Sequence, residues 1–260
     1  MCGIAGLCNW KGDIQKNIDK MNARMFHRGP DAGGSFIETD GSIALGHRRL
    51  SIVDLSPNGA QPMISHSGRF IIAFNGEIYN HRELRDKLIK EGRADNFRGT
   101  SDTEVLLELF ESYGVKAGIR MCKGMFAIAL YDRQERELFL LRDRLGEKPL
   151  YYGWVNNSFV FASDIGCIAE LDDFHNEINK GALPIYFIHG YIPAPYSVYE
   201  NIFKLEPGTI LTLRAPYKEF SMENYWSMKE VAKRGEEKPF QGTEEEATNE
   251  LERLLKEAIK

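Results

Sequence analysis

The sequence of 260 residues contains little cysteine and no paired cysteine motif. Its four cysteines form no CxxC pair, and its six histidines do not cluster near them, which argues against a zinc site. We predict that Cys8, Cys122 and Cys167 are reduced core residues, because each lies in an apolar segment. Cys2, beside the initiator Met, needs separate treatment.

Long hydrophobic runs and a strong excess of either charge are also absent. No apolar stretch approaches the roughly 20 residues that span a bilayer, and the apolar start lacks the charged region of a signal peptide. The net charge of -5 provides no basic surface for nucleic acid or an anionic membrane. We therefore expect a cytoplasmic, globular protein without a nucleic-acid or membrane partner.

The apolar segments that are present predict mainly strands. The first, residues 2–8, is small or apolar on both faces, so we expect an interior strand. Few helices separate these strands, which favours antiparallel sheets over a parallel one. The other predicted strands are a hairpin within 35–47, the segments 69–79, 124–132, 137–143, 149–154 and 159–163, and a last pair that ends near 213.

Capping residues predict the starts of the helices. They stand at Asp13, Asn80, Ser101 and Thr243. The first three helices fit layers packed outside two sheets. The last, residues 243–260, is amphipathic, and the preceding sequence offers no partner for its apolar face. We infer that a following domain or another subunit covers that face.

Cys2 is a candidate nucleophile, because a small second residue permits removal of Met1. The processed residue would carry a thiol and a free α-amine. An α-amine titrates at about 7.7–8.0 and a free cysteine near 8.5, so the amine is a usable base near neutral pH. This combination resembles the arrangement of threonine with its own terminal amine. The alternative is an ordinary buried cysteine beside a start codon.

Six motifs occur in order across the first 152 residues. They are "MCGIAG", "HRGPD", "GHRRLSIVDLSPNGAQPM", "FNGEIYNH", "SDTE" and "RDRLGEKPLYY". Together they resemble the class II glutamine amidotransferase domain, an N-terminal-nucleophile (Ntn) hydrolase, and within it the glutamine-hydrolysing asparagine synthetase family. The resemblance implies an α+β fold, a four-layer αββα sandwich of two antiparallel sheets. It also implies hydrolysis of L-glutamine to L-glutamate and ammonia through a thioester on Cys2.

The resemblance implies that Asn75 and Gly76 stabilise the oxyanion of this reaction. Asn75 would supply a side-chain N–H and Gly76 a backbone N–H. A glycine fits this role because a side chain there would keep the backbone from the substrate. The alternative for an Asn-Gly pair is a type I′ hairpin turn.

The resemblance also implies that Arg49 holds the α-carboxylate of glutamine. A guanidinium group can grip a carboxylate with two hydrogen bonds. Its neighbour Arg48 would point to the opposite face of a strand, so we expect only one of the two in the pocket; the alternative for either is a surface ion pair. Backbone carbonyls near Ile52 and Val53 would accept hydrogen bonds from the α-ammonium group.

Asp102 and Glu77 would balance the charge of that ammonium group. Asp102 equally suits a structural role, because a carboxylate after the Ser101 cap complements the helix dipole. Glu77 equally suits the solvated end of a strand. We interpret the remaining motif residues as loop scaffolding and ion pairs, namely His27, Arg28, Asp31 and the stretch 142–148.

The predicted organisation is an amidotransferase domain at 2–215, a linker at 216–242, and at 243–260 the start of a C-terminal synthetase domain. The SGGxDS signature of that domain does not occur in the sequence. We therefore expect no cofactor in this chain, and ATP and Mg²⁺ only in the synthetase domain.

The expected partners are L-glutamine, the synthetase domain and, as a candidate, a second copy of the chain in a homodimer. Two other functions stay open at this point. The chain could be an N-terminal-cysteine amidohydrolase that acts on another amide. It could also be a non-catalytic glutamine-sensing or assembly domain.

Overall fold

The computed structural model describes residues 1–51, 54 and 56–259. The chain divides into two compact units, Met1–Trp226 and Ser227–Lys260. Among the described residues, every helix is too short or too polar to cross a lipid bilayer.

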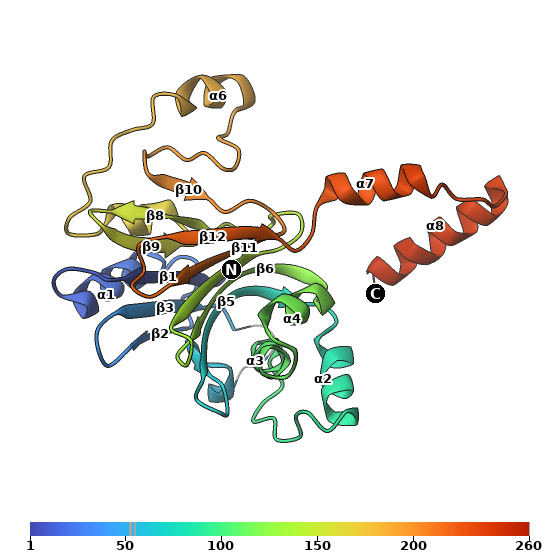
Figure 1. Ribbon diagram of the computed structural model, residues 1–260, viewed down its shortest axis with the longest axis horizontal. Coiled ribbons are helices and arrows are strands. Elements are labelled where there is room, and N and C mark those ends of the chain that lie inside the picture. The colour runs from blue at the N-terminus through green and yellow to red at the C-terminus, as the bar shows by residue number, and fades with distance from the viewer. Residues whose placement is uncertain (52–53, 55, 260) are drawn as a thin grey trace. The chain divides into compact units, whose positions relative to one another are not determined.

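Within the described residues, the strands of the first unit form two six-stranded antiparallel sheets (Figure 1). The first sheet has the order β10-β8-β9-β1-β3-β2, and its strands are Gly3–Cys8 (β1), Ala32–Ile37 (β2), Ile43–Arg49 (β3), Tyr151–Val155 (β8), Ser158–Ala162 (β9) and Ile202–Lys204 (β10). The second has the order β12-β11-β7-β6-β5-β4, and its strands are Met63–Ile64 (β4), Phe70–Ile78 (β5), Gly124–Asp132 (β6), Glu137–Arg142 (β7), Thr209–Arg214 (β11) and Phe220–Asn224 (β12).

Helices cover the outer faces of both sheets. The helices of the first unit are Ile14–Arg24 (α1), His81–Lys90 (α2), Asp102–Tyr113 (α3), Val115–Met121 (α4), Ile165–Ala169 (α5) and Ala182–His189 (α6), with a short 3₁₀ turn at Pro57–Gly59. Residues of α1 and α5 pack with β1 and β9, whereas α2, α3 and α4 pack on β5 and β6. Figure 1 shows α6 apart from both sheets.

One apolar cluster lies between each sheet and the helices that cover it, and a third fills the space between the two sheets. It joins Ile4 and Leu45 of the first sheet to Ala73, Ala127 and other residues of the second. The layers are therefore helix, sheet, sheet, helix, and the predicted αββα sandwich of antiparallel sheets is confirmed. Burial of apolar surface in these three clusters is the main stabilising contribution.

The strand β1 is buried along its whole length, as predicted for residues 2–8. It lies between β3 and β9 in the first sheet. In the register with β3, Gly3 faces Arg48, so Cys2 stands beside the end of β3. The β1–β3 pair therefore determines where the N-terminal residue lies.

The first unit extends past the boundary predicted at residue 215. The strand β12 pairs with β11 along its whole length, and the flanking Tyr217 and Tyr225 are buried in the core. Tyr217 belongs to the cluster between the sheets and Tyr225 to the cluster under α3. The folded unit thus ends at Trp226 rather than at 215.

The second unit consists of two helices, Met228–Glu237 (α7) and Glu244–Ile259 (α8). The helix α7 occupies part of the segment predicted as a linker, and the side chain of Ser227 caps it by accepting a hydrogen bond from the Glu230 N–H. Thr243 and Glu246 form the predicted capping box of α8. The apolar side chains of α8 are exposed: Leu251, Leu254, Leu255 and Ile259.

Candidate active site

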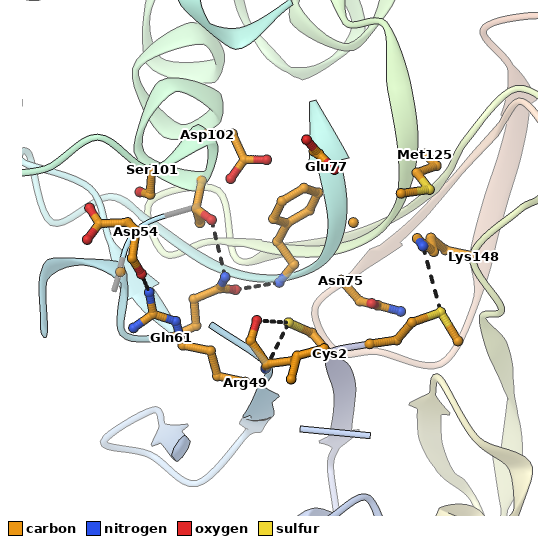
Figure 2. A pocket seen from close by; sticks show the side chains of 16 residues that line it. Cys2, Arg49, Asp54, Gln61, Asn75, Glu77, Ser101, Asp102, Met125 and Lys148 are labelled. Atoms are coloured by element: carbon orange, nitrogen blue, oxygen red, sulfur yellow. Dashed lines mark hydrogen bonds between the residues drawn. The ribbon is translucent and has the colours of Figure 1, made fainter. Parts of the chain in front are cut away.

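A pocket of about 190 Å³ opens at the end of the two sheets where β1 begins and β3 ends (Figure 2). Segments that are far apart in the sequence form its wall. They contribute Met1 and Cys2 at the start of β1, Arg49 at the end of β3, Asn75, Gly76 and Glu77 on β5, Asp102 at the start of α3, and Lys148 from the loop after β7. Every predicted site residue that the structure describes lies in this one wall.

The thiol of Cys2 is half-buried and held by the backbone of Leu50. Its Sγ lies 3.4 Å from the Leu50 nitrogen and 3.6 Å from the Leu50 oxygen. The carbonyl of Cys2 accepts a hydrogen bond of 3.1 Å from Arg28 Nε. These contacts hold both the side chain and the backbone carbonyl of Cys2, and the sulfur remains at the pocket surface.

The other three cysteines are buried in the cores, as predicted. Burial raises the pKa of the Cys122 and Cys167 thiols to about 12, and it also raises the pKa of Cys8. A thiol that stays protonated is a poor nucleophile. Among the four cysteines, Cys2 is therefore the one placed to react.

Asn75 contributes a buried amide group without a partner. Only 1% of the residue is exposed, and its Nδ2 has no hydrogen-bond acceptor among the described residues. Figure 2 shows this side chain between Cys2 and Lys148. A donor that is buried, unpaired and next to a thiol can bind an oxyanion that forms there.

Asn75 and Gly76 lie inside β5 rather than in a turn, so the alternative of a hairpin turn is wrong. The backbone N–H of Phe74 bonds to Gln61 Oε1 at 2.7 Å, and that of Ile78 bonds to Asp102 Oδ2 at 3.0 Å. Backbone groups alternate between the two edges of a strand. The N–H of Gly76 therefore points to the same edge as these two, toward the pocket.

The packing of β5 against its neighbouring strand also requires glycine at position 76. A Cβ atom there would lie 2.2 Å from the carbonyl oxygen of Met125 and 2.7 Å from the Cα of Phe126. Both atoms belong to the neighbouring strand β6. The close approach of β5 and β6 therefore excludes a side chain at this position.

Arg49 lies in the pocket wall, and Arg48 points away from it. The Arg49 guanidinium donates hydrogen bonds to the carbonyls of Asp54 and Ser56 and packs against Gly59. Arg48 instead bonds to the Gly29 carbonyl at 2.9 Å. Since a guanidinium carries five N–H donors, Arg49 keeps donors for a ligand carboxylate.

Acidic groups also line the pocket. Asp102 is 5% exposed, and burial raises the pKa of its carboxyl group. Glu77 is half-buried beside it on β5. Hydrogen bonds from Ser56 and from the Thr100 backbone hold the pKa of Asp54 at about 2. The other two positions predicted to contact the α-ammonium, Ile52 and Val53, lie outside the described residues.

Sequence reasoning missed three contributors to this site. Arg28 and Lys148 were interpreted as scaffolding, although Arg28 binds the carbonyl of Cys2 and Lys148 lines the pocket. Gln61 also lines the pocket and bonds to β5. All three lie in the motifs quoted above, but these motifs do not reveal the contacts, because each contact involves a distant segment.

The described residues contain no group of three or more histidine, cysteine or carboxylate side chains that could hold a metal ion. The polar side chains of the pocket are instead one thiol, two amides, two hydroxyls, two cations and three carboxylates. This set suits a small zwitterion that carries an amide.

Comparison with known proteins assigns the family. Residues 1–226 match the model of the glutamine amidotransferase domain. Asparagine synthetase (glutamine-hydrolyzing) 1 of Bacillus subtilis is 34% identical over 264 residues, which cover all of this chain and 39% of that protein. A Methanocaldococcus jannaschii protein that carries such a name provisionally is 39% identical over 247 residues, covering 88% of this chain and 47% of its own length. The chain thus spans less than half the length of these relatives.

Solved structures show the same fold at low sequence identity. The glutamine phosphoribosylpyrophosphate amidotransferase of B. subtilis superposes with a TM-score of 0.63 at 21% identity, over 87% of this chain and 50% of that one. A structure of the allosteric regulatory enzyme of purine biosynthesis gives a TM-score of 0.64 at 22% identity. The match covers 87% of this chain and 49% of that chain. With the match of the family model, the chain belongs to the glutamine amidotransferase domain family.

Proposed function

We propose that this domain hydrolyses L-glutamine to L-glutamate and ammonia through a thioester on Cys2. The observation that carries the proposal is the shared pocket, in which a half-buried thiol stands beside a buried amide without a partner. The membership of the chain in the glutamine amidotransferase domain family supports it.

The reaction needs a free amine on Cys2 and therefore the removal of Met1. The amine takes the proton of the thiol, and the sulfur attacks the side-chain carbonyl carbon of glutamine. The oxyanion that forms would receive hydrogen bonds from Asn75 Nδ2 and from the Gly76 N–H. The carbon–nitrogen bond then breaks, and ammonia leaves with the proton held by the amine. Water attacks the thioester, releasing glutamate and the thiol.

The ends of glutamine carry opposite charges, and the pocket offers a group for each. Arg49 would bind the α-carboxylate with its remaining donors. Asp102 and Glu77 would face the α-ammonium group. An ammonium beside Asp102 favours the charged carboxylate, which offsets the effect of burial on its pKa.

We further propose that the ammonia serves a synthetase domain that uses ATP and Mg²⁺ in a longer cytoplasmic protein, as an asparagine synthetase would. The names of the curated relatives and the share of their length that this chain spans support this. Residues 243–260 would then begin that domain. Binding of L-glutamine to the present chain requires no cofactor in this proposal.

Measuring glutamate release by the wild type and by Cys2→Ala tests the reaction. We expect full loss in Cys2→Ala and near wild-type rates in Cys122→Ala, which removes a buried thiol as a matched control. Equal rates in the wild type and Cys2→Ala would exclude the thioester. Hydrolysis of another amide in place of glutamine would indicate a different amidohydrolase, and glutamine binding without turnover would indicate a sensing domain.

Retention of Met1 should abolish activity. Met1 lines the pocket beside Cys2 and blocks its nitrogen by a peptide bond. Intact-mass spectrometry of active and inactive fractions measures this directly. Full activity in molecules that keep Met1 would contradict the role of the amine as base.

A further inference from the structure

Lys148 is a buried cation at the wall of the Cys2 pocket. It is 8% exposed, and its Nζ lies 3.7 Å from the sulfur of Met1 (Figure 2). The loop that carries it is fixed by Asp143, itself 1% exposed. The carboxylate of Asp143 accepts hydrogen bonds from the backbone N–H groups of Phe126, Leu145, Glu147 and Lys148.

The ammonium group of Lys148 has no carboxylate or carbonyl partner among the described residues; its contact is the Met1 thioether. The two arginines near Cys2 differ in this respect. Arg28 bonds to the Cys2 carbonyl, and Arg49 bonds to two loop carbonyls. A buried charge without a partner lowers the stability of the folded state. A functional role would explain why a lysine occupies this position.

We propose that Lys148 keeps the α-amine of Cys2 unprotonated near neutral pH once Met1 has been removed. Met1 is joined to the Cys2 nitrogen by a peptide bond, and its sulfur contacts Lys148 Nζ. The length of one methionine residue and this contact therefore limit the distance between the two nitrogen atoms. Loss of Met1 removes the sulfur contact, and both nitrogen atoms then border the space that Met1 had filled. A neighbouring positive charge disfavours protonation of an amine.

This inference rests on the proposed function, in which that amine is the base. Other charged groups face Cys2 from each surrounding element, namely Arg28 before β2, Arg49 on β3, Asp54 after β3, Glu77 on β5 and Asp102 on α3. The carboxylates favour the protonated amine, whereas the arginines oppose it, because a hydrogen bond to a neutral carbonyl leaves a guanidinium its charge. Lys148 adds a third cation, the one whose charged group contacts Met1.

The test uses the full chain with Met1 removed, as verified by intact mass. In Lys148→Met, which keeps the length of the side chain without its charge, the acidic limb of the pH profile of kcat/KM should move up by about one pH unit. Activity should therefore fall about tenfold below the wild-type midpoint and little at alkaline pH. Lys148→Arg should keep the wild-type midpoint, because it restores the charge.

Two results would overturn the inference. One is a loss of activity in Lys148→Met by the same factor at every pH. The other is an Arg variant as impaired as the Met variant. Either would indicate that Lys148 acts through packing rather than through its charge.

A titration without turnover separates this inference from the proposed function. With ¹³C-labelled cysteine, and the Cys2 signal assigned through Cys2→Ser, the lower midpoint of the amine and thiol pair can be followed by NMR. A lower midpoint in the wild type than in Lys148→Met supports the inference even if glutamine is not hydrolysed. Identical midpoints in active proteins overturn it and leave the glutaminase reaction standing.

Discussion

Among the single residues of the pocket, Asn75 has a buried Nδ2 with no hydrogen-bond acceptor among the described residues. A buried donor without an acceptor costs about 1–3 kcal/mol of stability. Its Nδ2 lies in the pocket wall with the thiol of Cys2, so the same group can find an acceptor when an oxyanion forms. The unpaired donor thus slightly destabilises the resting protein at the position where it would stabilise a transition state.

Asn75→Ala should therefore lower kcat for glutamine hydrolysis by about 10²–10³-fold, the usual effect of losing one oxyanion donor. Its thermal midpoint should change little, because removal of a donor that has no acceptor among the described residues offsets the packing lost by the smaller side chain. Steady-state kinetics and thermal unfolding measure the two effects.

Asn176→Ala is the matched control for that substitution. The Nδ2 of Asn176 donates to the carbonyls of Trp154 and Glu200, outside the pocket. Here we expect lower stability and unchanged kcat. If Asn75→Ala behaved like this control, the amide of Asn75 would be structural.

At the scale of elements, β5 matters because one of its edges carries no strand beyond Ile72. Side chains satisfy this open edge instead. Gln61 accepts from the Phe74 N–H, His47 Nε2 donates to the Phe74 carbonyl at 3.0 Å, and Asp102 accepts from the Ile78 N–H. These side chains hold the strand in place, and the Gly76 N–H lies on the same open edge.

Gln61→Met should remove the acceptor of the Phe74 N–H at constant side-chain length. We expect a loss of about 1–3 kcal/mol of stability and a lower kcat, since the neighbouring Asn75 and Gly76 lose their support. Gln61→Glu keeps an acceptor oxygen and should retain most of both. Urea unfolding and glutaminase kinetics measure these effects. Equal stability of the two variants would show that this hydrogen bond does not hold β5.

Most of the fold was predictable because the strands are apolar and the helices carry caps. The strand β12 was not, since its sequence FSMEN is mostly polar and exposed at the edge of the sheet. The places of Cys2, Arg49 and Asn75 in the pocket were predictable through family resemblance. Gln61, Arg28 and Lys148 were not assigned to the site, because their partners Phe74, Cys2 and Met1 come from other segments of the chain.

At the scale of the whole molecule, His47 joins the two sheets. It lies on β3 and donates to the Phe74 carbonyl of β5, while burial lowers its pKa from 6.5 to about 4. In the unfolded chain His47 would bind a proton below pH 6.5. The stability that it contributes is therefore complete above pH 6.5 and is lost as the pH falls toward 4.

The free energy of unfolding should fall by about 3 kcal/mol between pH 6.5 and 4 through this residue alone. His47→Gln, which can still donate a hydrogen bond but does not titrate, should show a shallower dependence over the same range. Urea unfolding at a series of pH values gives both slopes. Parallel slopes would rule out His47 as their source.

The division of the chain predicts where it can be shortened. A chain that ends at Trp226 keeps both sheets and all three apolar clusters, so we expect it to fold and to release glutamate from glutamine. A chain that ends at Ala215 loses β12 and the buried Tyr217 and Tyr225. We expect that chain to aggregate or to show no cooperative unfolding. Calorimetry of the two proteins distinguishes them.

Cys8, Cys122 and Cys167 are buried, whereas Cys2 is half-exposed, and this difference has a practical consequence. An uncharged alkylating reagent applied to the folded protein would be consumed at one sulfur atom per chain. The amount incorporated would count the competent molecules in a sample, and oxidative damage would begin at that same atom. Reducing agents and storage conditions thus decide how much of any preparation can turn over.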